Sequence, residues 1–133
     1  MVEKLKKLLE SSYCPYSKFA VSAIVVMRDG KEFGGVNVEN ASFGATICAE
    51  RNAITSAITA GYQKGDFKEI NIMVSSGNIS TCCFLCRQVI TEFFEKSATV
   101  NCYSNSGKVK KFTVGDMCPY PFDGSDLEWR VAL

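Results

Sequence analysis

Seven cysteines and no histidine stand in this chain of 133 residues. The odd number argues against a framework of paired disulfides and favours reduced thiols with metal-binding or catalytic roles. The absence of histidine excludes Ser-His and Cys-His nucleophile pairs, mixed Cys/His zinc fingers and proton transfer by imidazole. Acid–base chemistry near neutral pH must therefore fall to carboxylates, thiols, lysine or metal-bound water.

Two short segments, CAER at 48–51 and CFLC at 83–86, concentrate the chemically informative cysteines. Cys83 and Cys86 have the C-x2-C spacing with which two thiolates hold one tetrahedral zinc, although alone they could equally be small buried residues on a helix. Cys48 begins another predicted helix and adds a third ligand. A structural zinc takes four protein ligands, whereas three leave a position open for water, as in a catalytic site.

The charge of such a centre needs a cation nearby, because three thiolates on a divalent ion leave a net charge of about −1. Both segments lie at predicted helix N-termini, whose partial positive charge favours anions. Arg51 follows Cys48 by three residues on the same helical face and can donate to a thiolate. The alternative is an ordinary surface arginine, but the site's need for a cation favours the first interpretation. Glu50 is placed to take the proton of the bound water.

Hydrophobic periodicity predicts alternating helices and strands. The predicted helices are 2–12, 48–60 and 83–96, and the predicted strands are 19–27, 31–38, 69–75, 98–103 and 109–114. Thr81 is the expected cap of the third helix. Short turns imply antiparallel hairpins, and helices flanking a five-stranded mixed sheet give a three-layer α/β/α fold. With no repeat or linker, we expect a single domain over residues 1–133.

Composition excludes several partners. No stretch approaches the ~20 apolar residues of a membrane span, and the N-terminal segment lacks the pattern of a secretory signal, so we expect a cytoplasmic protein without membrane contact. The net charge is +1, and the basic cluster Lys108, Lys110 and Lys111 is small for a nucleic-acid binder. The single tryptophan, Trp129, offers no stacking platform of interleaved aromatic and basic residues.

Several stretches together resemble the small cytidine deaminases along nearly the whole chain. The matching segments are 13–19 (YCPYSKF) with Val21, 35–41 (GVNVENA), 48–51 (CAER), 86–89 (CRQV), and Pro119 with Phe122. Zinc deaminases hold their metal with three cysteines, or one histidine and two cysteines, and use a nearby glutamate that is not a ligand. The combination is specific, although each piece alone would be weak.

The resemblance implies zinc-dependent hydrolytic deamination of free cytidine and deoxycytidine to uridine and deoxyuridine, a reaction of pyrimidine salvage. One zinc ion per subunit would be bound by Cys48, Cys83 and Cys86. Zinc-bound hydroxide would attack C4 of the pyrimidine. Glu50 would shuttle protons between water, the ring nitrogen and the leaving ammonia.

The resemblance also assigns substrate contacts and an assembly. Asn37 and Glu39 match a pair that hydrogen-bonds the ribose hydroxyl, and Phe19 matches an aromatic residue that packs against the pyrimidine. The backbone N–H of Ala49 would meet the pyrimidine carbonyl. Phe122 matches an aromatic residue given to a neighbouring subunit's site in a homotetramer. The alternatives are a core position for Phe19, a solvated hairpin edge for Asn37 and Glu39, and an ordinary tail residue at Phe122.

The chain departs from the family at four positions. Cys82 and Phe84 replace a proline and a glycine around the second metal segment, Phe43 replaces a tyrosine, and Ser22 replaces a glycine. None removes a ligand or the glutamate. Two rival functions remain: a deaminase of another base or nucleoside analogue, and a catalytically weak zinc-binding relative. The nucleoside-type pair of Asn37 and Glu39 argues against the first, and retention of Glu50 argues against the second.

Overall fold

The computed structural model describes residues 1–125 and 127, so that Trp129 lies outside the described residues. One sheet has the strand order β2-β1-β3-β4-β5. Its strands are β1 (Val21–Met27), β2 (Glu32–Val36), β3 (Phe67–Val74), β4 (Phe94–Tyr103) and β5 (Val109–Thr113). β3 and β4 run parallel, and the other neighbouring pairs run antiparallel. The predicted five-stranded mixed sheet is confirmed.

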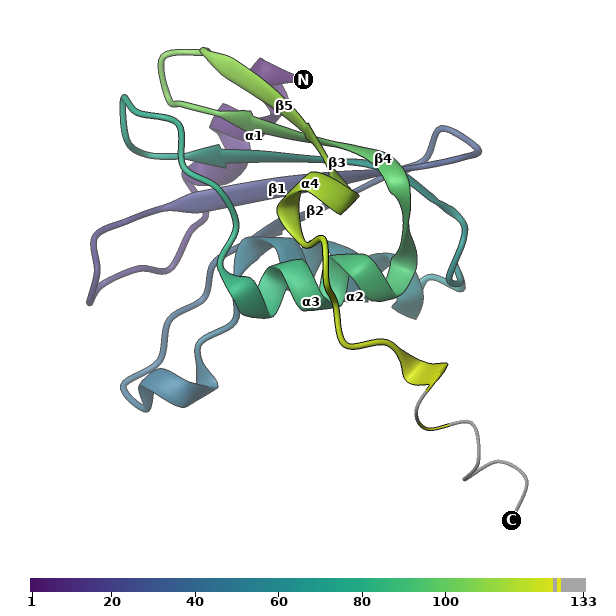
Figure 1. The fold of residues 1–133 in the computed structure, drawn as a ribbon. Coiled ribbons are helices and arrows are strands. Elements are labelled where there is room, and N and C mark those ends of the chain that lie inside the picture. Colours follow the sequence, from purple (N-terminus) through teal and green to yellow (C-terminus); the bar gives the residue numbers. More distant parts are fainter. Residues whose placement is uncertain (126, 128–133) are drawn as a thin grey trace.

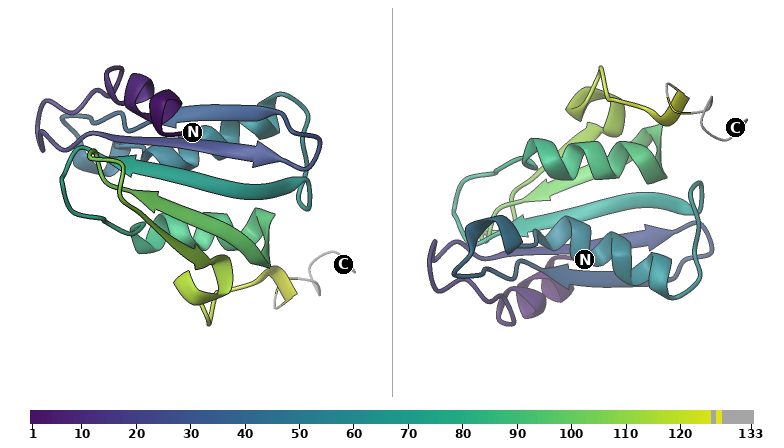
Figure 2. Two further views of the ribbon diagram at one scale, coloured as in Figure 1. Left: turned by 90° about the horizontal axis from the view of Figure 1, so that it is seen from above. Right: turned by 90° about the horizontal axis from the view of Figure 1, so that it is seen from below.

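Helices cover both faces of this sheet (Figure 1). α1 (Val2–Leu9) packs on one face against β1, β2 and β3, while α2 (Ala49–Thr59) and α3 (Phe84–Phe93) lie on the opposite face. Figure 2 shows the two faces in turn, with α1 above the sheet and the other two helices beneath it. The three-layer α/β/α arrangement is therefore confirmed. Among the described residues no helix has the length and apolar character needed to cross a membrane.

The parallel pairing of β3 with β4 requires a crossover, and α3 supplies it. The main core lies between the sheet and the two helices beneath it. Phe67 is fully buried there, and its ring centroid lies 5.7 Å from that of Phe93 and 5.0 Å from that of Phe94. Leu5 fills a second, smaller core under α1 with Ile24 and Met73.

The structure explains one of the four departures from the family pattern, the serine at position 22. Its side chain is fully buried on β1, and its hydroxyl donates to the carbonyl of Leu5 over 2.9 Å. A buried hydroxyl needs such a partner, because leaving it unsatisfied costs about 1–3 kcal/mol. The serine therefore attaches α1 to the sheet and lies away from the pocket described below.

Gly35 on β2 is a point of very close approach between the sheet and α2. A Cβ built on Gly35 would lie 2.5 Å from the carbonyl oxygen of Ala49 and 2.9 Å from Cβ of Asn52, and would also overlap the backbone nitrogen of Ala53. Only a hydrogen fits in that space, which is why a glycine is required here. The Asn52 amide adds a bond across the same contact, donating to the carbonyl of Val36 over 2.7 Å.

Three details of the predicted elements are wrong. The first helix ends at Leu9 and not at residue 12, and the third ends at Phe93, where β4 begins at once. Thr81 does not cap that helix. The cap is Cys83, whose sulfur accepts from the backbone N–H of Cys86 over 3.4 Å.

The hydroxyl of Thr81 instead accepts from Nη2 of Arg87 over 2.9 Å. Two short helices were also not predicted, the 3-10 turn η1 (Phe43–Ala45) and α4 (Val114–Met117).

Candidate metal centre and substrate pocket

Three thiols meet where α2 and α3 begin. Cys48 directly precedes α2, Cys83 directly precedes α3, and Cys86 lies in the first turn of α3. Their sulfur atoms all lie within 4.8 Å of one another, and Sγ of Cys48 is 3.9 Å from Sγ of Cys83. Two thiolates bound to one tetrahedral zinc at about 2.3 Å would be roughly 3.8 Å apart. The three thiols therefore fit a single zinc ion.

The surroundings favour negative charge on these sulfurs. Nη2 of Arg51 donates to Sγ of Cys48 over 3.4 Å. A hydrogen bond from the Cys86 thiol, followed by the contacts with Arg51, lowers the pKa of Cys48 to about 5. The same bond to Cys48, together with burial, raises the pKa of Cys86. Both helix N-termini add partial positive charge at the thiols, as anionic ligands require.

Glu50 lies in the first turn of α2 with only 5% of its surface exposed. Burial raises the pKa of its carboxyl above the usual range, and negative charge at Cys48 adds to this. A buried carboxyl beside the thiol cluster is placed to accept and return a proton there, as a general acid–base group must. The buried Cys82 thiol lies beside this carboxyl and outside the three-thiol cluster.

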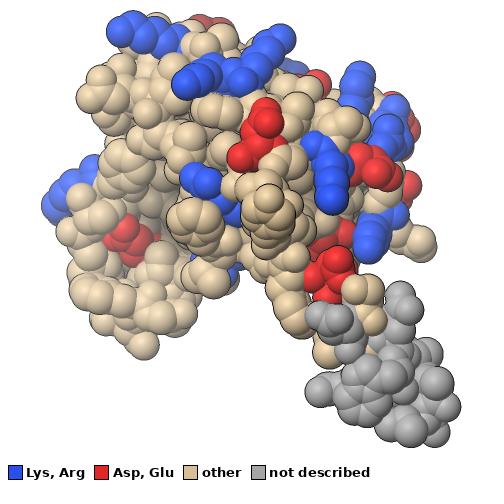
Figure 3. Space-filling model, viewed as in Figure 1, with Lys and Arg blue, Asp and Glu red and all other residues tan. Residues whose placement is uncertain are grey.

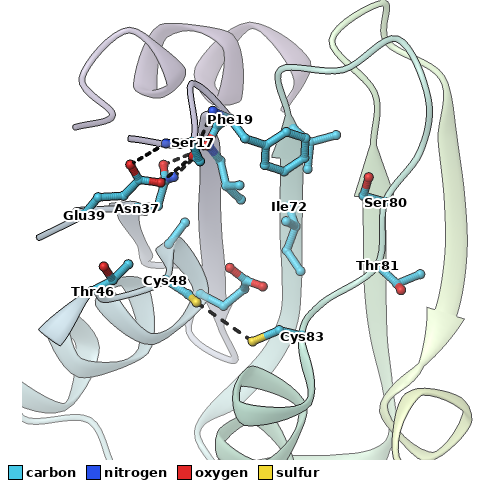
Figure 4. Close-up of a pocket in the computed structure, with 14 residues that line it drawn as sticks. Ser17, Phe19, Asn37, Glu39, Thr46, Cys48, Ile72, Ser80, Thr81 and Cys83 are labelled. Atoms are coloured by element: carbon cyan, nitrogen blue, oxygen red, sulfur yellow. Dashed lines mark hydrogen bonds between the residues drawn. The ribbon is translucent and has the colours of Figure 1, made fainter. Parts of the chain in front are cut away.

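A cavity of about 300 Å³ opens above the thiols, a size suited to a small-molecule ligand (Figure 4). One end is lined by Cys48, Cys83 and Glu50, and the other by Ser17, Asn37 and Glu39. Apolar side chains of β1 and β3 and the ring of Phe19 form the wall between them. The pocket thus has a metal-binding and proton-transferring end, an apolar middle and a polar end.

Asn37 is 8% exposed, so a solvated edge does not describe it. Its Oδ1 accepts from the backbone N–H of Val21 over 2.9 Å and from the hydroxyl of Ser12. Its Nδ2 donates to the carbonyl of Phe19 over 2.8 Å. These bonds leave one N–H of the amide for a ligand. Asn37 therefore links the strand ends that form the polar end of the pocket.

Glu39 lies beside Asn37 and accepts hydrogen bonds from the loop that precedes β1 (Figure 4). A hydrogen bond from the Ser17 side chain, followed by its backbone N–H, lowers the pKa of the Glu39 carboxyl below its ordinary value. The carboxylate is thus ionised and fixed in direction at the polar end of the pocket.

The remaining predicted contacts divide into two groups. Phe19 and Ala49 line the pocket, Phe19 with 38% of its surface exposed and Ala49 buried at the start of α2. Phe122 does not line it and is 60% exposed. The Phe122 backbone is bound by the side chain of Gln88 on α3. Within one subunit, the structure does not bring Phe122 to the other predicted site residues.

Four hydroxyl-bearing residues of the pocket were not predicted as site residues: Ser17, Thr46, Ser80 and Thr81. Ser17 lies within the 13–19 stretch that carries the resemblance, and this was the one available signal. Ser80 and Thr81 belong to the loop that leads into the second metal segment, and no spacing or periodicity distinguishes their hydroxyls from those of an ordinary surface loop.

Two substitutions relative to the family lie at the rim. Phe43 is 74% exposed and packs edge-on against Tyr16 with ring centroids 5.8 Å apart. Phe84 is 77% exposed, and the guanidinium of Arg87 lies 4.6 Å from its ring centre. Neither side chain enters the metal-binding end of the pocket.

Comparison with known proteins identifies a single family. The model of the "Cytidine and deoxycytidylate deaminase zinc-binding region" matches residues 1–104. A cytidine deaminase of Sporosarcina psychrophila is 36% identical over 134 residues, covering 98% of this chain and 97% of its own. A probable cytidine deaminase of Dictyostelium discoideum is 37% identical, covering 94% of this chain and 88% of its own.

Solved structures give the same result. The crystal structure of cytidine deaminase from Burkholderia pseudomallei is 40% identical and superposes with a TM-score of 0.87, covering 91% of this chain and 95% of that one. The cytidine deaminase of Mycobacterium tuberculosis is 28% identical, with a TM-score of 0.79 and coverage of 92% and 94%.

Proposed function

The chain belongs to the cytidine and deoxycytidylate deaminase family, and from that membership we propose that it converts free cytidine and deoxycytidine to uridine and deoxyuridine. Water replaces the exocyclic amine, which leaves as ammonia, and the reaction serves pyrimidine salvage. The observation that carries the proposal is the pairing of a three-thiol cluster with a buried carboxyl at one end of a nucleoside-sized cavity.

Cys48, Cys83 and Cys86 would hold one zinc ion per subunit. When bound, zinc supplies a Lewis acid that makes water nucleophilic near neutral pH. Glu50 would accept one proton of the attacking water and pass it to the ring nitrogen N3. It would then take the second proton, from the hydroxyl newly bonded to C4, and deliver it to the exocyclic amine, which leaves as ammonia while the C4 carbonyl forms. The raised pKa of Glu50 supports this role, because the carboxyl must exchange protons in both directions.

The other residues bind and orient the nucleoside. Glu39 and Asn37 hydrogen-bond a ribose hydroxyl at the polar end, and the ring of Phe19 packs on the pyrimidine. The backbone N–H of Ala49 meets the pyrimidine carbonyl. Arg51 offsets the negative charge of the thiolates through its bond to the nearest sulfur.

A free nucleoside, rather than a base within a strand, is the substrate. Holding a strand requires cations along its phosphates, yet basic and acidic side chains are interspersed over the face shown in Figure 3, which has wide uncharged areas. Glu39 adds a second reason. Its carboxylate suits a free hydroxyl donor and repels a phosphate esterified at that oxygen. Neither nucleic acid nor a membrane is therefore among the proposed partners.

The active form is a homotetramer whose sites are shared between subunits. Large apolar side chains are exposed in the first turn of α3, with Phe84 at 77% and Leu85 at 67%, and after α4, with Tyr120 at 94%. Contact with other subunits would cover such side chains. Phe122 is anchored by its backbone outside its own pocket, as a residue given to a neighbour would be.

We also propose that residues 1–133 form one catalytic domain, part of which lies outside the described residues. A cytoplasmic location fits the cysteines, since all seven are free.

The test is the loss of cytidine absorbance with purified, zinc-loaded protein. Cytidine and deoxycytidine should be consumed with little dependence on moderate salt, while cytidine monophosphate and a single-stranded oligonucleotide should be poor substrates. Glu50→Gln is the matched control, because it is nearly isosteric but cannot cycle a proton. It should retain zinc and lose about 10²–10⁴-fold in kcat.

Salt-sensitive deamination of the oligonucleotide, with free cytidine untouched, would show that the substrate is wrong. Full turnover by Glu50→Gln would show that the mechanism is wrong. Light scattering that finds an active monomer would overturn the shared sites.

A further inference from the structure

The hydroxyl group of Ser17 connects the polar end of the substrate pocket with its apolar wall. Its Oγ donates to Oε2 of Glu39 and accepts from the backbone N–H of Phe19 over 3.0 Å. The loop residue thus touches both the carboxylate at the polar end and the backbone of the aromatic residue on the wall. Figure 4 shows the three residues together at that end of the pocket.

The same loop gives two more donors to this carboxylate. The backbone N–H groups of Tyr16 and Ser17 both donate to Oε1 of Glu39 over 3.0 Å. Consecutive N–H groups of this kind form a concave anion-binding arrangement. Directly beyond them the chain turns back at Lys18, which adopts the left-handed conformation with φ of 60°, an unfavourable conformation for a non-glycine residue.

Counting acceptor positions shows where a ligand can bind. An ionised carboxylate offers about four lone-pair positions, two on each oxygen. The loop occupies both positions on Oε1 and one on Oε2. One position remains, and it belongs to the oxygen that the Ser17 hydroxyl holds. The direction of that last position therefore depends on the Ser17 side chain.

We infer that Ser17 is a positioning residue for ribose recognition: its hydroxyl fixes Oε2 of Glu39 so that a single acceptor position faces the sugar hydroxyl of the substrate. The inference rests on the proposed function and adds a residue to it. Ser17 acts through Glu39 and has no part in the proton transfers at the opposite end of the pocket. Its loss should therefore weaken substrate binding without slowing the chemistry.

Steady-state kinetics of Ser17→Ala on cytidine test this directly. KM should rise about tenfold, the effect of one hydrogen bond to a charged group, while kcat stays within about twofold. Ser17→Thr keeps a hydroxyl and should restore KM. Ser76→Ala is a matched control, because the Ser76 hydroxyl also accepts from a backbone N–H two residues ahead, over 3.0 Å, but contacts no carboxylate. It should leave KM unchanged.

A series of 2′-, 3′- and 5′-deoxycytidine distinguishes positioning from a general loosening of the loop. Glu39→Gln should weaken the binding of every analogue except the one that lacks the contacted hydroxyl. Ser17→Ala should show the same exception. If Ser17→Ala instead weakens all analogues equally, or leaves KM for cytidine unchanged, the inference is wrong.

Two further measurements separate a failure of the Ser17 inference from misfolding of the variant and from failure of the proposed function. If Ser17→Ala does not fold, as judged by zinc content and thermal unfolding, the pair Ser17→Thr and Ser17→Val tests the same hydroxyl at nearly constant shape. If the zinc-loaded wild-type protein does not deaminate cytidine, the proposed function has failed. If it does and the Ser17 variants behave like wild type, only the role of Ser17 has failed.

Discussion

Gln88 holds the backbone of Phe122 through both atoms of its side-chain amide: Nε2 donates to the Phe122 carbonyl over 2.6 Å, and Oε1 accepts from the Phe122 N–H over 3.3 Å. The neighbouring Arg87 donates from Nη1 to the carbonyl of Met117 over 2.9 Å. α3, which contains Cys86 and is capped by Cys83, therefore also fixes the chain that follows α4. Phe122 itself is 60% exposed.

Replacing Gln88 by leucine should release this segment. Both hydrogen bonds are lost, so the backbone near Phe122 should become more accessible to limited proteolysis, while zinc content stays the same. Activity on cytidine should fall as well, because the Phe122 ring would no longer be presented to a neighbouring site. Gln63→Leu is the control, since the Gln63 side chain makes no hydrogen bond within the described part of the chain.

Mixed assemblies test whether the segment acts between subunits. Gln88→Leu chains keep Glu50 but have a loose segment around Phe122. Glu50→Gln chains keep that segment in place but lack the acid–base group. Co-assembly of the two should restore activity above that of either alone. A mixture that forms tetramers yet gains no activity would place the effect of Gln88 within its own subunit.

Zinc binding should depend on Cys83 and not on its neighbour. Cys83→Ala removes one of three thiols that fit the metal, so elemental analysis should find the ion lost or weakly held, and thermal stability should fall because metal binding is coupled to folding. Cys82→Ala changes the adjacent thiol, which is buried beside Glu50, and should retain near-stoichiometric zinc. Equal zinc loss in both variants would contradict the ligand assignment.

The contribution of Glu39 to substrate binding should be constant with pH across the neutral range. The Ser17 contacts lower the pKa of this carboxyl from its ordinary 4.5, so it is ionised at every pH above that value and is protonated only below it. The ratio of kcat/KM between wild type and Glu39→Gln should therefore hold from about pH 8 down to about pH 5.5. In Ser17→Ala the lost donor raises the pKa of Glu39 back toward 4.5, so the decline should begin at a higher pH.

Much of this structure was accessible from local sequence patterns. The spacing of Cys48, Cys83 and Cys86 indicated a three-thiol site, and the periodicity of buried residues located all five strands. These signals are strong because ligand geometry and side-chain periodicity are encoded in short stretches of chain.

The predicted element boundaries were wrong where contacts between residues distant in the sequence determine the local structure. Residues 94–96 continue a helical pattern, yet Phe94 pairs with Phe67 and starts a strand, because pairing in the sheet outweighs local helix preference. α4 had a local signal, the capping box between Thr113 and Asp116, but it follows a strand without any intervening loop.

The roles of Ser17 and Gln88 could not be predicted from the sequence. Ser17 binds a carboxylate 22 residues away, and Gln88 binds a backbone 34 residues away. No periodicity or spacing rule reports such pairs, because the partners meet only when the sheet and the helices are assembled.

Gly35→Ala should impair activity although residue 35 does not line the pocket. The added methyl group would overlap the backbone of α2, so the helix must move. A displacement of about 1 Å near reacting groups can cost about 10²-fold in rate. Kinetics with zinc analysis would measure this, and Gly44→Ala is the control because a Cβ there meets nothing within 4 Å. Unchanged kinetics would mean that the contact can relax without disturbing the site.

The contact at Gly35 also sets the distance between the two ends of the pocket. Asn37 and Glu39 follow it along the chain at one end of the pocket. At the other end, Glu50 lies in the first turn of α2, the helix that Gly35 touches, and Cys48 directly precedes that helix. The distance between the residues proposed to bind the sugar and those proposed to remove the amine is thus set largely by a contact of backbone against backbone. In a nucleoside the distance from sugar to amine is fixed by covalent bonds. The two ends of the pocket are therefore held at one distance, which a nucleoside matches. Pyrimidines whose sugar is attached through a longer linker should not be accepted, even when every contacting group is present.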